Sequence, residues 1–182
     1  SFFQNTCKPK GLGGSLMVNM MNIGHSPMAE WGWKHIKINK NDISLDVGCG
    51  GGANIKKLLE KSPKGKVFGI DYSEVSVRKS KKVNKFAVER KHCEILQGNV
   101  QELPFANETF DLATAFETIY FWSDIDQSFS QIYRVLKKGG IFMVCNESNG
   151  ENDKDKKWTE IIKGMKIYTS KEIKYSLEKA GF

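Results

Sequence analysis

The 182-residue chain predicts an α/β fold with a doubly wound, mainly parallel sheet. Two observations predict it. Short runs rich in β-branched and aromatic residues alternate with longer amphipathic runs, and a glycine-rich turn follows the first short run. Alternating strands and helices are typical of parallel sheets that helices cover on both faces. A chain of this length also fits a single domain of about 100–200 residues.

Five strands and four helices follow from this pattern. We expect strands at 42–47, 66–71, 93–98, 110–116 and 141–147. Between them, we expect helices at 53–62, 73–90 and 125–140. The polar stretch 148–158 reads as a mobile loop. Thr169 and Glu172 then form a T-x-x-E capping box that opens a last helix, which ends at Gly181.

The N-terminal part differs in composition from the rest. Apolar and aromatic residues recur near helical spacing over 17–36, interrupted by Gly24 and Pro27, which predicts two short helices with a break. We therefore divide the chain into a helical cap or lid at 1–40 and a main domain at 41–182.

Composition narrows the possible functions. The net charge of +7 rests mainly on lysines spread along the chain, so a nucleic-acid surface is possible but not favoured. The four cysteines form no CxxC pair and the three histidines have no ligand-like spacing, which predicts no metal site and a reduced, cytoplasmic setting. No apolar run approaches the ~18–20 residues of a membrane span.

The stretch LDVGCGGGANI, residues 45–55, carries the strongest functional signal. A strand runs into G-x-G-x-G, at Gly48, Gly50 and Gly52, and then into a helix, so bare backbone N–H groups face a ligand. Gly48, Gly50 and Ala53 also match the dinucleotide-binding pattern G-x-G-x-x-G/A, so a nicotinamide or flavin enzyme has to be considered. Asp46 favours another ligand. Its charge repels a pyrophosphate and suits a cationic group, or a network that orients the loop around one.

The segment LDVGCGGG resembles the first motif of the class I (Rossmann-like) S-adenosylmethionine-dependent methyltransferases. Further motifs of that family follow in order over about 42–147, and the flanks resemble more loosely its ubiquinone-biosynthesis-like branch (type 11). The resemblance implies S-adenosyl-L-methionine as cofactor, S-adenosyl-L-homocysteine as product and a small-molecule acceptor.

The resemblance also implies roles for the residues that follow the strands. Asp71, at the end of the second strand, would accept hydrogen bonds from both ribose hydroxyls, and Tyr72 would lie against the adenine. Asn99 replaces the acid usual in the family and can still accept a hydrogen bond from the adenine amino group, with Val100 beside it. Backbone around Ala115 would flank the methionine portion.

Methyl transfer is an in-line displacement for which a base is optional. If the acceptor must lose a proton, Glu117 is the nearest acidic candidate, with Tyr120 or His25 as alternates. Tyr120 and Trp122 follow the carboxyl end of the fourth strand, where open α/β sheets bind ligands, and could form an aromatic wall.

Other functions stay open. They are an RNA methyltransferase steered by the lysines, a non-catalytic S-adenosylmethionine-binding module, and, third, a nicotinamide oxidoreductase. The family normally closes its sheet with two further strands, whereas this sequence ends in EKAGF after the preceding helix, so we expect the C-terminal strands to be missing. We expect a monomer or, through an exposed sheet edge, a homodimer.

Overall fold

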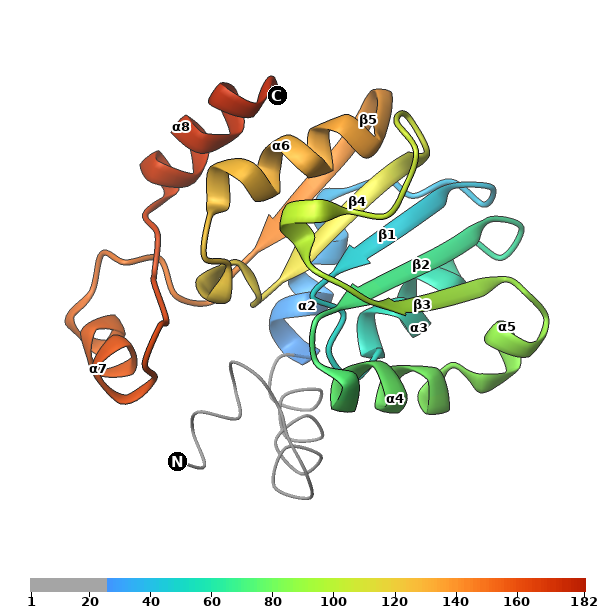
Figure 1. Ribbon diagram of the computed structural model, residues 1–182, viewed down its shortest axis with the longest axis horizontal. Helices are drawn as coiled ribbons and strands as arrows, with labels where there is room; N and C mark the ends of the chain where they lie inside the picture. The colour runs from blue at the N-terminus through green and yellow to red at the C-terminus, as the bar shows by residue number, and fades with distance from the viewer. Residues whose placement is uncertain (1–25) are drawn as a thin grey trace.

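The structure is a computed structural model that describes residues 26–182 (Figure 1). Its centre is a five-stranded parallel sheet in the order β3-β2-β1-β4-β5. The strands are β1 (Ile43–Val47), β2 (Lys66–Asp71), β3 (Cys93–Gln97), β4 (Phe110–Phe116) and β5 (Leu136–Cys145). The predicted doubly wound α/β fold is confirmed.

Helices cover both faces of the sheet (Figure 1). They are α2 (Ser26–Gly32), α3 (Ala53–Lys61), α4 (Glu74–Val83), α5 (Lys85–Glu89), α6 (Ile125–Val135), α7 (Asp153–Ile161) and α8 (Ser170–Ala180). One hydrophobic core lies between the sheet and α6 with α8, and a second lies between the sheet and α2, α3 and α4. Because both faces of the sheet are covered, the consecutive residues Ser44, Leu45, Asp46 and Val47 of β1 are all buried, although their side chains alternate between the faces.

The boundaries of two predicted helices are wrong, each for a local reason. The expected helix at 73–90 is interrupted at Asn84, whose side-chain amide donates to the carbonyls of Gly52 and Ser80 at 3.0 Å each. The expected helix at 125–140 ends at Val135 because β5 already begins at Leu136, which pairs with Phe110 ahead of an irregularity in the ladder.

The predicted mobile loop at 148–158 is also wrong in its second half, where α7 begins. Asn152 caps this helix, and its side-chain oxygen accepts from the Asp155 N–H at 3.1 Å. The Asp155 carboxylate in turn accepts from the backbone of Asn149 and Gly150. The polar residues that suggested a loop therefore satisfy the backbone at a helix start. The capping box of Thr169 and Glu172 is confirmed at the start of α8.

Of the two short helices predicted for 17–36, the first lies outside the described residues, as does His25. The second corresponds to α2 and the short helix η2 (Trp33–His35). Trp33 is buried, with its ring 4.7 Å from that of Phe116, so this segment is packed against the end of β4. No helix in the described part of the chain is long and apolar enough to cross a membrane.

Candidate active site

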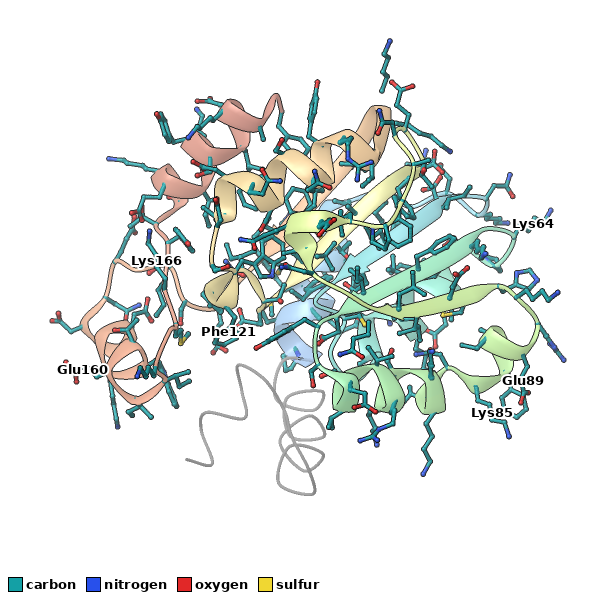
Figure 2. All side chains as sticks on the ribbon, viewed as in Figure 1. Lys64, Lys85, Glu89, Phe121, Glu160 and Lys166 are labelled. Carbon is teal, nitrogen blue, oxygen red and sulfur yellow. The ribbon has the colours of Figure 1, made fainter. Side chains whose placement is uncertain are left out.

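A cavity of about 730 Å³ lies at the carboxyl ends of the parallel strands. Its walls come from α2, the glycine loop, the start of α3 and the residues that follow β2, β3 and β4. Figure 2 shows the side chains that fill the surrounding region and labels Phe121, a lining residue on the short helix η4 (Ile119–Phe121). Residues far apart in the sequence thus share one cavity.

The glycine loop is tied to the neighbouring strand by hydrogen bonds. The N–H groups of Gly48 and Cys49 both donate to the carbonyl of Ile70, at 2.8 and 3.1 Å. Asp71 accepts from the Gly50 N–H at 2.9 Å with one oxygen and from the Ser73 N–H at 2.8 Å with the other. Burial raises the pKa of Asp71, and these two hydrogen bonds oppose that rise. Asp71 therefore fixes the loop while lining the cavity.

The three glycines of the motif serve different purposes, although all have a positive φ. A Cβ on Gly48 would lie 2.0 Å from Thr118 Oγ1, and one on Gly52 would lie 2.4 Å from Ser80 Oγ. A Cβ on Gly50 would meet no atom of the described chain within 4 Å, and Gly50 lines the cavity. Gly48 and Gly52 thus permit close packing within the protein, whereas Gly50 leaves room for a ligand.

Asp46 lies beneath the loop and not in the cavity wall. Its side chain is 1% exposed, and one of its oxygens accepts from Thr114 Oγ1 at 2.7 Å. The other oxygen has no hydrogen-bond partner among the described residues. Burial raises the pKa of Asp46 to about 7, and the nearby charge of Asp71 adds to this effect. Asp46 therefore does not contact a molecule in the cavity. It can act on one only by its charge or by holding the loop in place.

The other predicted cofactor residues fall into two groups. Tyr72, 42% exposed, lines the cavity together with Asn99 and the buried Val100. The Asn99 side-chain oxygen also accepts from the Gln101 N–H at 3.0 Å, so it caps the short helix η3 (Val100–Glu102). Ala115, in contrast, is fully buried within β4 and does not line the cavity. The assignment of all these residues to a cofactor stays a prediction.

Aromatic side chains from η2 and from the end of β4 onward also line the cavity. Trp33, Phe116, Phe121 and Trp122 line it. Tyr120 does not, because its side chain is buried beside that of Glu117. The geometry therefore favours Trp122 and Phe121 over Tyr120 for contact with a bound molecule.

Glu117 is the acidic residue that the cavity exposes at the end of β4. Its carboxylate accepts from the Tyr120 hydroxyl at 3.0 Å and from the Glu147 N–H. Burial raises the pKa of Glu117 to about 7, against the effect of these hydrogen bonds. A carboxyl group in this condition exchanges protons near neutral pH.

Sequence reasoning did not identify an ion pair that joins α2 to α3 at the cavity. Glu30 of α2 pairs with Lys57 of α3 at 2.7 Å, and both line the cavity together with Ala29. Ion pairing between two helices leaves no signal in the local sequence pattern.

Cys49 also lines the cavity, but burial raises the pKa of its thiol well above the usual value, which makes it a poor nucleophile. Within residues 26–182, no group of His, Cys, Asp or Glu could hold a metal ion.

A parallel sheet with a glycine loop after its first strand and an acid after its second defines a nucleoside-cofactor-binding α/β protein. Residues 45–144 match the family model described as a methyltransferase domain, and the chain belongs to this family. The resemblance to class I S-adenosylmethionine-dependent methyltransferases is thereby confirmed.

Relatives and solved structures agree with this family. The methyltransferase YrhH of Bacillus subtilis is 30% identical over 131 residues, which are 70% of this chain and 69% of YrhH. The 24-methylenesterol C-methyltransferase 3 of Arabidopsis thaliana is 29% identical over 158 residues, but the match covers 81% of this chain and only 43% of that protein. The methyltransferase solved in complex with the Haloferax volcanii Trm112 activator has a TM-score of 0.83 at 23% identity, over 91% of this chain and 72% of that one.

Proposed function

We propose that the protein transfers the methyl group of S-adenosyl-L-methionine to a small molecule bound in the same cavity, with S-adenosyl-L-homocysteine as the second product. The observation that carries this proposal is the bare space at Gly50, where the loop lines the cavity and a Cβ would meet no described atom. A loop that is braced on its protein side and open on its cavity side fits a bound nucleoside.

Residues at the ends of β2 and β3 fit the nucleoside portion. Asp71 uses each carboxylate oxygen once for the backbone and keeps lone pairs for ribose hydroxyls. Tyr72, Val100 and Asn99 line the cavity beyond it and would enclose the adenine. Ala115 lies behind the wall, so we assign it to the support of the methionine portion.

Asp46 suits the charge of this ligand. The cofactor supplies a methyl group made electrophilic by a sulfonium, and its amino-acid end carries an ammonium. The buried carboxyl of Asp46, one oxygen of which has no partner within residues 26–182, lies just below the loop, where a positive charge would favour its ionised form. A diphosphate would have the opposite effect, which argues against a dinucleotide.

Three features favour a small, largely apolar acceptor. The cavity is of the size that suits small ligands, Phe121 and Trp122 line it, and a relative is named for a sterol substrate. Residues 26–40 contribute Ala29, Glu30 and Trp33 to the wall, so we also propose that the N-terminal part acts as a lid over the acceptor. Of the two residues predicted for catalysis, Glu117 lines the cavity and Tyr120 does not.

The test separates binding from transfer. Calorimetry should show binding of S-adenosyl-L-homocysteine but not of a nicotinamide dinucleotide. Incubation of the protein with methyl-labelled cofactor and a cell extract should then place label in the small-molecule fraction. Label in the RNA fraction would replace the small-molecule acceptor by RNA. Binding without any labelled product would leave a non-catalytic binding module.

A further inference from the structure

The backbone of Glu117 is held in an uncommon conformation. Its φ is 52°, in the left-handed region that costs a residue with a side chain about 1 kcal/mol or more. Its N–H donates to the carbonyl of Cys145, the last residue of β5, at 2.9 Å. The turn therefore directs the side chain of a strand-end residue into the cavity wall and fixes it between two strands.

Two further segments hold the Glu117 carboxyl group. The same oxygen, Oε1, accepts from the Tyr120 hydroxyl and from the Glu147 N–H. The Tyr120 oxygen in turn accepts from the Ser148 N–H at 3.0 Å. The backbone after β5 thus donates hydrogen bonds both to the Glu117 carboxyl group and to the Tyr120 hydroxyl that also binds this carboxyl group.

The surrounding groups keep this carboxyl ready to exchange a proton. Burial raises its pKa to about 7; the hydrogen bonds from Glu147 N–H and Tyr120 lower it, and the negative charges of Glu147 and Asp155 raise it. Another titratable neighbour, Cys145, has a pKa that burial raises to about 11, so its thiol stays neutral. The Tyr120 hydroxyl also stays neutral, since burial raises its pKa.

We propose that Glu117 removes a proton from the methyl acceptor, that Tyr120 and the backbone of Glu147 and Ser148 position it, and that the acceptor is a neutral, largely apolar molecule whose reacting atom carries a hydrogen. This inference rests on the proposed methyl transfer and adds the chemical class of its acceptor.

The step balances without a further reactant. An electron pair of the acceptor atom forms the new bond to the methyl carbon, and the bond from that carbon to sulfur breaks with its electrons remaining on sulfur. The proton of the acceptor atom passes to the Glu117 carboxylate, which afterwards releases it to water. Glu117 starts and ends the cycle ionised.

A base at Glu117 disfavours other acceptor classes. An anionic group would be repelled where it approaches the Glu117 carboxylate, and a tertiary amine or thioether has a free lone pair and no proton for Glu117 to remove. The aromatic side chains of Phe121 and Trp122, which line the same cavity as Glu117, suit an apolar skeleton.

The first experiment measures transfer and binding in three variants. Glu117→Gln should lower label transfer to the small-molecule fraction at least 100-fold and leave the Kd for S-adenosyl-L-homocysteine within threefold of the wild-type value.

Tyr120→Phe should move the pH midpoint of transfer upward, because it removes a hydrogen bond that favours the ionised carboxylate. Tyr168→Phe is the matched control. Tyr168 is also buried, but in the core that α6 and α8 cover, and the midpoint should not move.

The second experiment needs no acceptor. In protein with carbon-13 in the glutamate carboxyl groups, the signal lost in Glu117→Gln should titrate near pH 7 in the wild type. Titration of that signal below pH 5, or full transfer by Glu117→Gln, would overturn the inference. A wild-type protein that does not bind S-adenosyl-L-homocysteine would instead overturn the proposed function, so the two failures are distinct.

Discussion

The two halves of the cavity are built in different ways. Around Asp71 and the glycine loop, backbone N–H groups donate to the Ile70 carbonyl and to the Asp71 carboxylate at the end of the neighbouring strand. Around Glu117, the contacts join side chains and segments from η2, the end of β4 and the residues after β5. The first half is a property of the fold, whereas the second depends on which side chains this chain places there.

This difference indicates which residues of the cavity can be substituted without loss of the loop structure. Backbone contacts of the loop require glycine or a small residue at fixed positions, so few sequences satisfy them. The aromatic residues and Glu117 can change without disturbing those contacts, which lets one scaffold serve several acceptors. The predictions below test how independent the two halves are.

The largest effect is expected where the halves meet. Gly48→Ala should destabilise the protein by about 3 kcal/mol or more, because its Cβ would collide with Thr118 and its φ of 71° disfavours alanine. Urea denaturation measures this loss. Adding Thr118→Gly, which removes all three colliding atoms of that side chain, should recover part of it, and no recovery would mean that the contact between the halves is not the cause.

A second pair of variants separates ligand contact from backbone strain. Gly50→Ala and Gly139→Ala both place a Cβ at positive φ with no described atom within 4 Å, so each should cost about 1 kcal/mol of stability. Of these two glycines, Gly50 lines the cavity and Gly139 does not. The Kd for S-adenosyl-L-homocysteine should rise about 30-fold in Gly50→Ala and less than twofold in Gly139→Ala. Equal Kd values would show that no ligand approaches the loop at this point.

The smallest effect concerns pH. The folded pKa of Asp46, about 7, exceeds the ordinary value of 3.8, so the native state binds more protons than the unfolded state between these values. Its contribution to the free energy of unfolding therefore falls as pH rises from about 4 to 7. Asp46→Asn should gain about 1–2 kcal/mol relative to wild type between pH 6 and pH 8, measured by denaturation without ligand.

Asp111→Asn provides the control. Burial works to raise the pKa of Asp111, but hydrogen bonds from Lys137 and the Ile43 N–H outweigh it and lower the pKa. Its stabilising contribution is present above the ordinary carboxyl pKa and is lost only as pH falls below it, so the stability difference should be constant between pH 5 and 8. A constant difference for Asp46→Asn as well would mean that Asp46 is ionised in the free protein.

The sequence predicted the strands and the loop well because their signals are local. Runs of β-branched residues indicate β1 to β4, and each glycine of the motif has a positive φ. The interruption at Asn84 could not be predicted, because it depends on a hydrogen bond to Gly52, 32 residues away. The start of β5 at Leu136 likewise depends on pairing with β4.

The site shows the same limit. The sequence placed Asp71 and Glu117 at strand ends, and both line the cavity. It could not show that Tyr120 is turned away from the cavity to support Glu117, or that Asp46 lies below the loop. Periodicity locates a residue on an element, but the direction of its side chain depends on packing with distant segments.

The bracing of the glycine loop by Asn84, Asp71 and the Ile70 carbonyl has a thermodynamic consequence. A segment that already has its backbone partners loses little conformational entropy when a nucleoside arrives. The methyl donor then binds to a loop that is already ordered. Most of the conformational entropy lost during the reaction cycle is therefore lost when the acceptor binds.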